Sequence, residues 1–303
     1  MTLARPLRLG TRGSPLALVQ ANMVAAALRA AYGWAEDAIV IVPVKTTGDQ
    51  VQDRPLAEIG GKALWTKELD RALLDGAIDF AVHSMKDVET IRPAAIRIAA
   101  MLPRADVRDR LIGAESIAAL PRGARIGTSS PRRAAQLRRL RPDVSIIPFR
   151  GNVDTRLRKL AEGEADATLL AAAGLERLER PDIGVAIPLD VMLPAPAQGA
   201  VGIEARADDA ATLAFLAAID HAETHACVAV ERAFLAALGA DCHSPVAALA
   251  TRDGGLRAEL LSEDGAFHLT GHRMPAGPTE AGELADWLLG QAPPAIRGLF
   301  TGR

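Results

Sequence analysis

The chain has 303 residues, 49% of them hydrophobic and 24% charged, so it can bury large cores and is expected to form two or three domains. It has no apolar run near 18 residues, and residues 1–6 lack the apolar core of a signal peptide, so neither a membrane span nor a secretory leader is expected. A net charge of −2 and only two cysteines exclude a global attraction to nucleic acid and a disulfide scaffold, and they favour a reducing cytoplasm.

Strands and helices alternate in the first third of the chain. Apolar periodicity predicts strands at Leu7–Gly10, Ile39–Val44, Ile78–Val82 and Ile96–Met101, and helices at Pro15–Ala31 and Thr66–Asp75. This alternation implies crossover units and a mostly parallel sheet. Residues 46–62 lack periodicity, and a loop of that length in a compact domain is typical of a lid or a disordered segment.

A second run of the same kind begins near Pro103. It predicts strands at Arg125–Gly127, Val144–Ile147 and Ala167–Ala171, and helices at Pro131–Leu140, Val153–Glu162 and Ala173–Leu178. Three prolines within Pro188–Pro196 prevent regular helix there and indicate a crossing between domains. The fold class is therefore α/β, with two lobes built on mostly parallel sheets.

The last segment has a different pattern. A helix is predicted from about Glu223 to Leu238, followed by a loop at residues 239–245 and short strands separated by Asp-Gly turns. A closing helix is expected at Thr279–Gly290, with Thr279 as its N-cap. These elements predict a small α+β domain. The expected domains are residues 1–102 with a return segment at about 197–221, residues 103–196, and residues 222–303.

Two strand-to-helix turns resemble each other. Ser14-Pro15 and Ser130-Pro131 each combine a good N-cap with a good first helical residue. Ordinary helix capping explains both pairs. The alternative is two related sheets, each directing the free N–H groups of a helix N-terminus toward a shared cleft.

The predicted strand Ile78–Val82 leads directly into Lys86 and Asp87. In an open α/β sheet, ligands bind beyond the carboxyl ends of the strands. An ammonium and a carboxylate at that place can together hold an anion and transfer protons. The alternative interpretation is a solvated Lys-Asp pair in a loop.

Basic residues gather between Arg122 and Lys159. This segment has eleven basic and two acidic residues, whereas the rest of the chain has 24 basic and 35 acidic ones. Arg132 and Arg133 fall in the first turn of a predicted helix, where the helix dipole opposes cations, and Arg150 precedes the next helix, which contains Arg156. These positions favour a polyanion site. Arg138, Arg139 and Arg141 fall at the favourable end of their helix and are interpreted as surface charge.

The composition narrows the choice of polyanion. Aromatic residues make up 3% of the chain, which leaves few stacking platforms for single-stranded nucleic acid, and no helix-turn-helix or zinc-finger spacing is present. Neither a Walker A motif nor a G-x-G-x-x-G turn occurs. Paired arginines bind carboxylates as well as phosphates. An arginine-rich nucleic-acid binder nevertheless stays open as an alternative at this point.

The cysteines and histidines near the C-terminus suggest two kinds of site. Cys227 lies in an apolar helical run, whereas Cys242 lies in a polar loop and is the better candidate for a reactive thiol. His221 and His225, spaced i and i+4, raise a zinc alternative together with the cysteines and His243. No C-x-x-C or H-E-x-x-H pattern supports this, and no metal is predicted.

Six motifs, in order, resemble the porphobilinogen deaminase (hydroxymethylbilane synthase) family from Arg8 to at least Pro245. They are Thr11-Arg12-Gly13-Ser14-Pro15-Leu16-Ala17, Gly60-Gly61-Lys62, Ala81-Val82-His83-Ser84-Met85-Lys86-Asp87-Val88, Gly127-Thr128-Ser129-Ser130, Arg150-Gly151-Asn152-Val153 and Ala197-Gln198-Gly199-Ala200. Cys242 falls where the family attaches its cofactor.

The resemblance implies a fold, a cofactor and a reaction. It implies two lobes like those of a periplasmic binding protein, with the active site between them, and a third domain. It implies a dipyrromethane cofactor held by a thioether to Cys242. Four porphobilinogen molecules are then added head to tail, each with loss of ammonia, and the tetrapyrrole is released by hydrolysis as hydroxymethylbilane. The resemblance thus implies a transferase of tetrapyrrole and haem biosynthesis. A non-catalytic two-lobed polyanion-binding protein is the alternative function.

The resemblance also implies roles for individual residues. Asp87 is the expected catalytic residue, because a carboxylate can transfer protons and stabilise the cation left by ammonia. The expected cofactor-binding residues are Cys242, Lys86, Thr128, Ser129, Ser130, Arg132, Arg133 and Arg156. The expected substrate-binding residues are Arg12, Ser14, Arg150, Arg177 and Gln198. The expected partners are porphobilinogen and the growing pyrrole chain, with no nucleic acid and no membrane, and the chain is expected to be a cytoplasmic monomer.

Several positions depart from the family pattern. Ala240 and Asp241 stand where two glycines usually precede the cysteine, and Pro196-Ala197 replaces a usual Val-Gly. The remaining departures are Trp65 for a usual phenylalanine, Glu89 for a usual proline, and Pro131 before the double arginine. None of these changes removes a chemical group that the reaction requires.

Overall fold

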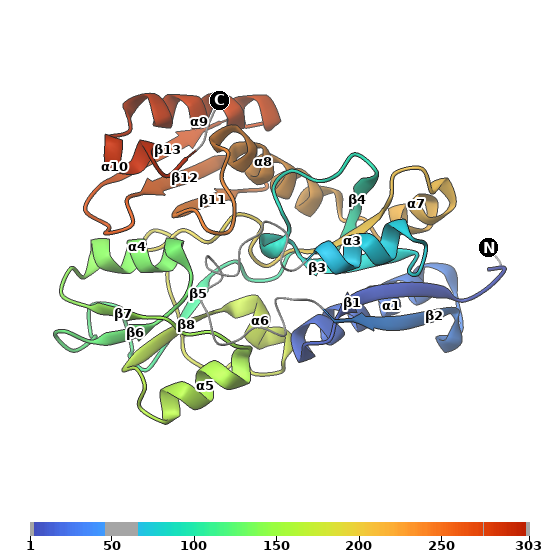
Figure 1. The fold of residues 1–303 in the computed structure, drawn as a ribbon, viewed down its shortest axis with the longest axis horizontal. Helices are drawn as coiled ribbons and strands as arrows, with labels where there is room; N and C mark the ends of the chain where they lie inside the picture. The colour runs from blue at the N-terminus through green and yellow to red at the C-terminus, as the bar shows by residue number, and fades with distance from the viewer. Residues whose placement is uncertain (1–2, 46–65, 275, 301–303) are drawn as a thin grey trace. The chain divides into compact units, whose positions relative to one another are not determined.

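The computed structural model describes residues 3–45, 66–274 and 276–300. The expected lid at 46–62, the Gly60-Gly61-Lys62 motif and Trp65 lie outside the described residues. The chain divides into two compact units, residues 1–104 with 200–225 (the first unit) and residues 105–199 with 226–303 (the second unit). Figure 1 follows the chain from blue at the N-terminus to red at the C-terminus.

The first unit contains a five-stranded sheet in the order β2-β1-β3-β10-β4. Its elements are β1 (Leu7–Arg12), α1 (Pro15–Tyr32), the 3-10 helix η1 (Glu36–Ala38), β2 (Ile39–Val44), α3 (Lys67–Leu74), β3 (Phe80–Ser84), the 3-10 helix η3 (Met85–Asp87), β4 (Ile96–Met101), β10 (Val201–Arg206) and α7 (Ala210–Ala217). Strand β1 pairs in parallel with β2 and β3, and β10 pairs antiparallel with β3 and β4. Four strands therefore run one way and β10 runs the other.

Helices pack on both faces of this sheet because its strands are apolar on both faces. Leu9 and Val82 belong to the core that α1 and α7 cover, whereas the neighbouring Ala81 belongs to the core that α3 covers through Leu69 and Leu73. Helix α1 starts as predicted: Ser14 accepts a hydrogen bond from the Ala17 N–H, and Pro15 is the first helical residue. It ends at Gly33, whose φ of 66° suits glycine.

The second unit repeats this strand order as β7-β6-β8-β5-β9. Its α/β elements are β5 (Asp109–Ile112), β6 (Arg125–Gly127), α4 (Pro131–Leu140), β7 (Ser145–Ile147), α5 (Val153–Ala161), β8 (Ala167–Ala171), α6 (Ala172–Arg177) and β9 (Val185–Ala186). Strand β6 pairs in parallel with β7 and β8, and β5 pairs antiparallel with β8 and β9. Each α/β sheet therefore has one reversed strand, next to the edge strand, at the same place in its order.

The remainder of the second unit has its own sheet and core. Its elements are α8 (Ala222–Leu238, whose first residues belong to the first unit), β11 (Val246–Ala250), β12 (Leu256–Leu261), β13 (His268–Arg273), α9 (Pro278–Gln291) and α10 (Pro294–Arg297). The three antiparallel strands pack against α8 and α9 through Phe234, Leu260 and Leu288 (Figure 1). The predicted cap of the last helix was wrong. Gly277 is the N-cap of α9, and its N–H donates to the Glu280 carboxylate at 2.9 Å.

The predicted elements are largely confirmed, with several exceptions. Strand β3 begins and ends two residues later than expected, at Phe80 and Ser84. Seven elements were not predicted: the strands β5, β9 and β10, the helices α7 and α10, and the 3-10 helices η1 and η3. Strands β5 and β10 follow the points where the chain passes from one unit to the other, and β9 pairs with β5. All three lie outside the regular alternation of strands and helices. No single described helix is long and apolar enough to cross a membrane, although the bent pair α7 and α8 passes that test by length and composition.

Candidate functional site

The carboxyl edge of the first sheet brings together residues from two of the predicted motifs. Strands β1 and β3 are parallel neighbours, so their carboxyl ends lie at the same edge of the sheet. Arg12 is the last residue of β1. Lys86 and Asp87 lie in the 3-10 helix that follows β3. The sequence prediction that Asp87 follows a strand's carboxyl end is therefore confirmed.

Asp87 lines a hollow within the first unit. The hollow has a volume of about 70 Å³ and is partly open to solvent, and its lining residues are Arg12, Ser14, Leu16, Ala17, Gln20, Thr66, Val82, His83, Ser84, Asp87 and Val88. Asp87 is half-buried. Beside it, the buried Gln20 donates to the Ser84 hydroxyl at 2.8 Å, which fixes the end of β3 against α1. Asp87 and Arg12 thus line the same hollow.

A buried ionic cluster lies behind this hollow. The Glu204 side chain is fully buried, with His83 Nε2 3.2 Å from one carboxylate oxygen and Arg92 Nε 2.8 Å from the other. Burial alone would raise the pKa of Glu204, but the hydrogen bonds and charges of His83 and Arg92 lower it to about 2. Arg92 also pairs with Glu89, whose other oxygen accepts a hydrogen bond from the Thr66 hydroxyl at 2.9 Å. Glu89, a departure from the family pattern, thus has a defined role in holding this cluster.

The carboxyl edge of the second sheet brings together residues from the other predicted motifs. Residues Thr128–Ser130 follow β6, Arg150 follows β7, and Arg177 ends the short helix after β8, and these three strands are parallel neighbours. The Ser129 hydroxyl donates to the Phe149 carbonyl at 2.8 Å, and the Thr128 hydroxyl accepts from the Ser130 N–H at 3.2 Å. The first contact joins the two loops, and the second lies within the loop after β6.

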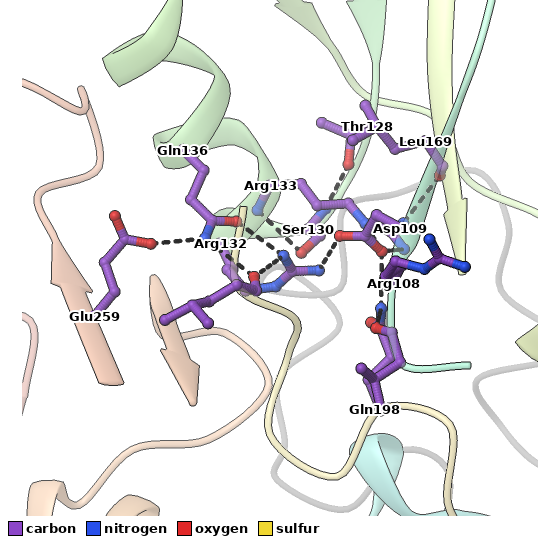
Figure 2. Close-up of polar contacts among 12 residues, drawn as sticks. Arg108, Asp109, Thr128, Ser130, Arg132, Arg133, Gln136, Leu169, Gln198 and Glu259 are labelled. Carbon is purple, nitrogen blue, oxygen red and sulfur yellow. Dashed lines mark hydrogen bonds and ion pairs between the residues drawn. The ribbon is translucent and has the colours of Figure 1, made fainter. Parts of the chain in front are cut away.

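Arg132 and Arg133 lie at the start of α4, and both are bound to one carboxylate, that of Asp109 (Figure 2). Arg132 Nη2 is 2.8 Å from one oxygen, and Arg133 Nη2 is 2.6 Å from the other. All three side chains are almost inaccessible, with 4%, 6% and 2% of their surface exposed. Burial would raise the pKa of Asp109, but the two guanidinium charges lower it well below its usual value.

Sequence reasoning missed Asp109 because it missed β5. This strand is reversed, so its first residue lies at the edge where the parallel strands end, and Asp109 pairs in register with Ala171. The strand alternates buried and partly buried positions, with Asp109 and Leu111 buried. The alternation is visible in the sequence, but aspartate is rare in strands, so a pattern with Asp109 at an inward position was not recognised as a strand.

Other polar groups complete the cluster around the two arginines. Gln198 Nε2 donates to Asp109 at 2.9 Å, and Arg132 Nη1 donates to Gln136 at 2.8 Å. Gln136 in turn donates to Glu259 of β12 at 2.7 Å (Figure 2). Gln198, predicted as a substrate ligand, therefore contacts the carboxylate that holds both arginines. Arg132 and Arg133, which the sequence analysis assigned to a ligand, already share the carboxylate of Asp109. The three side chains together keep a net charge of +1.

Several guanidinium groups keep donors that no described group accepts. Arg132 Nε, Arg150 Nη1 and Arg177 Nε are buried without a hydrogen-bond partner among the described residues. Arg177 also donates to the Gly199 carbonyl at 2.7 Å, and Arg156 donates through Nε to the Gly151 carbonyl at 3.0 Å. A buried unpaired N–H is costly, and an anionic ligand would satisfy it.

The arginines at the C-terminal end of α4 have structural contacts. Arg141 donates to the Ile117 and Leu120 carbonyls at 3.0 and 2.9 Å and is 2.7 Å from Asp143. Arg138 donates to the Glu263 carbonyl at 2.7 Å. The interpretation of these residues as plain surface charge was therefore incomplete, because Arg141 ties a loop to the helix.

The Cys242 thiol is exposed in the loop between α8 and β11, whereas Cys227 is half-buried against the core around Phe234. The Asp241 carboxylate accepts a hydrogen bond from the His243 N–H at 2.8 Å, and the Asp241 N–H donates to the Ser244 hydroxyl at 3.2 Å. Among the described non-glycine residues only Glu179 and Ala197 have left-handed φ angles. The loss of two glycines before Cys242 therefore causes no backbone strain there.

The histidines considered for zinc have separate partners. His221 Nδ1 is 2.9 Å from the Thr224 hydroxyl, and His225 Nδ1 is 2.9 Å from the Asp220 carboxylate. Within the described part of the chain, no group of three or more His, Cys, Asp or Glu side chains is arranged to hold a metal ion.

Two successive parts of the chain match models of the same protein family. Residues 7–214 match the family model described as porphobilinogen deaminase, dipyromethane cofactor binding domain, and residues 225–285 match porphobilinogen deaminase, C-terminal domain. A protein named porphobilinogen deaminase from Sphingopyxis alaskensis is 63% identical over 98% of this chain and 97% of that protein. A protein of the same name from Paracoccus denitrificans is 50% identical over 95% of each chain.

The solved structures that match this chain have lower sequence identities. Immunogenic lipoprotein A from Vibrio vulnificus is 15% identical, with a TM-score of 0.43 over 72% of this chain and 96% of that one. A periplasmic substrate-binding protein of an ABC transporter from Coxiella burnetii is 15% identical, with a TM-score of 0.43 over 75% of this chain and 95% of that one.

Proposed function

Since the chain belongs to the porphobilinogen deaminase family, we propose how its own residues carry out the reaction of that family. The chain is a hydroxymethylbilane synthase, a transferase of tetrapyrrole biosynthesis that acts on porphobilinogen with a dipyrromethane cofactor. The family matches do not favour the alternative of a non-catalytic polyanion-binding protein. The individual residue roles, the division into domains and the oligomeric state are proposals.

The residues present fit a dipyrromethane group. Each of its two pyrrole rings carries an acetate and a propionate, so the group requires several cationic donors. The second unit offers buried, unpaired N–H donors on Arg132, Arg150 and Arg177. It also offers the exposed Cys242 thiol, which is the nucleophile that a thioether requires. When bound, the group supplies the pyrrole carbon to which the first substrate is joined.

Asp87 is the catalytic residue in this proposal, and its place in the hollow carries the argument. As ammonia leaves porphobilinogen, the pyrrole becomes positively charged, and the half-buried carboxylate of Asp87 in this hollow stabilises that charge. The same carboxylate can accept and return the protons that the condensation moves. Arg12 and Ser14 line the same hollow and are proposed to bind a substrate carboxylate there.

The remaining residues are proposed to hold carboxylates of the cofactor and the growing chain. The cofactor group consists of Cys242, Lys86, Thr128, Ser129, Ser130, Arg132, Arg133 and Arg156. The substrate group consists of Arg12, Ser14, Arg150, Arg177 and Gln198. The support is their position: each described strand of the parallel trio β6, β7 and β8 is followed by one or more of them.

We also propose three domains, residues 1–102 with about 197–221, residues 103–196 and residues 222–303. A separate three-stranded sheet with its own core supports the third. A cytoplasmic location is supported by the small number of cysteines, two in the whole chain. The chain is proposed to act as a monomer, without nucleic acid or a membrane as partner.

Intact-mass measurement tests the covalent part of the proposal. Purified protein should carry an adduct of two pyrrole units, and a peptide digest should locate it on Cys242 and not on Cys227. Cys242→Ser should lose the adduct and the activity. It should also lose part of its thermal stability, because a group bound only to the folded state stabilises that state. Unmodified Cys242 in fully active enzyme would refute the proposal.

A further inference from the structure

The cluster around Asp109 has an organisation that the proposed ligand roles do not explain. Asp109 Oδ1 accepts hydrogen bonds from Arg133 Nη2 at 2.6 Å, Arg133 Nε at 3.2 Å and Gln198 Nε2 at 2.9 Å. Asp109 Oδ2 accepts from Arg132 Nη2 at 2.8 Å. The carboxylate therefore has four donors and no exposed lone pair for chemistry, so its function must be exerted through the groups that it binds.

The two arginines are fixed from both sides. Arg132 Nη1 donates to the Leu193 carbonyl at 2.8 Å as well as to Gln136, and Arg133 Nη1 donates to the Leu169 carbonyl at 2.9 Å. Each guanidinium plane is thus held by a carboxylate on one side and a backbone carbonyl on the other (Figure 2). Arg132 Nε remains buried without a partner among the described residues. These contacts fix the directions of the remaining guanidinium N–H groups of Arg132 and Arg133.

The turn that contains Gln198 is held by a hydrogen bond to Glu231 of helix α8. The Glu231 carboxylate is fully buried and accepts the Ala197 N–H at 2.5 Å and the Ala250 N–H of β11 at 2.8 Å. Ala197 adopts a φ of 61°, in the left-handed region, so the turn before Gln198 keeps an unfavourable backbone conformation. Glu231 offsets that cost and holds the turn that presents Gln198 to Asp109.

We propose that Asp109 is a positioning residue for this reaction: it orients Arg132 and Arg133 toward the carboxylates of the bound polypyrrole and limits the charge of the pair to +1. Two adjacent guanidinium groups would repel each other and take several rotamers without a shared anion. With Asp109 in place, both have one orientation and their free donors are preorganised. This inference rests on the proposed role of Arg132 and Arg133 in binding the cofactor.

Asp79 provides a matched control in the first unit. Its carboxylate is also almost inaccessible, at 3% exposure, and it also pairs with two arginines, Arg5 at 2.7 Å and Arg8 at 3.2 Å. It lies before β3, at the amino edge of the sheet, away from Asp87 at the carboxyl edge. Asp79→Asn therefore removes a buried carboxylate between two arginines without touching the candidate site.

The experiment compares Asp109→Asn, Asp79→Asn and Arg132→Leu in full-length protein carrying the adduct. Turnover of porphobilinogen is expressed per adduct-bearing molecule, counted by intact mass, and measured below the melting temperature of every variant. Asp109→Asn should lower kcat by about tenfold or more and change KM by less than about threefold, because the arginines hold the attached chain and not the incoming substrate. Asp79→Asn should lower the melting temperature and leave kcat and KM unchanged.

Three outcomes would overturn the inference. These are normal kcat in Asp109→Asn, an equal loss of kcat in Asp79→Asn, or a loss confined to KM. If Arg132→Leu keeps full turnover, the proposed cofactor role of the arginine fails instead. If Arg132→Leu is slow and Asp109→Asn is normal, only the positioning role fails. Should Asp109→Asn not fold, Gln198→Met decides: it removes a donor to Asp109 without changing charge, and it should lower kcat by about threefold or more with little change in KM, whereas the loss of a substrate contact alone would raise KM. Unchanged kcat in Gln198→Met would then refute the inference.

Discussion

The two α/β sheets have equivalent strand orders, and each has an aspartate at its carboxyl edge. The two aspartates differ in their contacts. In the first sheet, Asp87 follows the central strand β3, lines a hollow and takes part in none of the described hydrogen bonds or ion pairs. In the second sheet, Asp109 begins the reversed strand β5 and is saturated by two arginines and a glutamine. An unpaired carboxylate can transfer protons, whereas a saturated one can only orient its partners.

The difference shows that topology determines the place of a charged group but not its role. Both edges are suited to ligands because several strands end there. The role depends on whether neighbouring helices supply cations to the carboxylate. Helix α4 has Arg132 and Arg133 in its first turn, while the first turn of α1 contains no charged residue.

Replacing Asp87 tests the comparison most severely. Asp87→Asn keeps the shape of the side chain but can neither carry a proton nor offset a cation, so turnover should fall by about 10²–10⁴-fold. Tetrapyrrole formation from porphobilinogen is the assay, and circular dichroism with thermal unfolding is the control for folding. Near-normal turnover in a folded variant would remove the distinction between the two edges.

Two arginines of the second unit test the comparison next: Arg150 in the loop after β7, and Arg138 in the last turn of α4. Arg150→Leu removes a half-buried cation whose Nη1 is buried without a partner among the described residues, so the binding of the polycarboxylate should weaken by about 2–5 kcal/mol. Arg138→Leu removes a single hydrogen bond to the Glu263 carbonyl and should have little effect on kcat/KM. Steady-state kinetics of both variants provide the measurement. Equal losses would show that the carboxyl edge is not the criterion for ligand binding.

Asp79 allows a pH test of a carboxylate between two arginines. Its pKa is lowered to about 2, because the hydrogen bonds from Arg5 and Arg8 outweigh the effect of burial. A lowered folded-state pKa means that Asp79 stabilises the fold above pH ~4 and that this contribution is lost as the pH falls toward 2. Because Arg5 is 54% exposed, we expect only about 1–2 kcal/mol.

Urea unfolding at pH 5 and at pH 2.5, roughly on either side of the ordinary aspartate pKa, measures this contribution. Asp79→Asn should be less stable than the original chain at pH 5, and the difference should be clearly smaller at the lower pH, because part of the contribution is lost between the two values. A difference that persists unchanged at low pH would mean that shape, and not charge, explains the effect.

Ala197 gives the smallest expected effect. Its left-handed backbone costs a non-glycine residue about 1–2 kcal/mol, while glycine loses about 0.5–1 kcal/mol in entropy, so Ala197→Gly should stabilise the fold by up to about 1 kcal/mol. Glu179, with a φ of 60°, is the matched control on an exposed turn. Chemical unfolding of both glycine variants should show gains of similar size. A loss of stability in Ala197→Gly alone would mean that the turn requires the methyl group.

The sequence predicted the regular part of the fold because that part follows local rules. Strands β2, β4, β6 and β8 and helix α4 have the predicted bounds, since apolar periodicity and Ser-Pro caps are local signals. The reversed strands β5 and β10 escaped prediction because their place depends on chain crossings, which periodicity does not encode. Thr279 was predicted as a cap because threonine favours that position, but Glu280 closes the turn from inside the helix.

The site was predictable to a similar extent. Asp87 and the loop of Cys242 could be located from motifs beside strand and helix ends. The partners Asp109 and Glu204 could not, because they are brought to the site by long-range pairing of β5 and β10. The family pattern also gave no reason for Glu89, whereas the structure shows it bonded to Thr66 and Arg92.

The reversed strands have a consequence for folding during synthesis. The first sheet needs β10 between β3 and β4, so its interior remains open until residue 206 has been made, although its other strands end by residue 101. The second sheet is complete once β9, at residues 185 and 186, has been made. On the ribosome, we therefore expect the later sheet to close first. The earlier strands must wait, with edges unpaired, for a strand made about a hundred residues later.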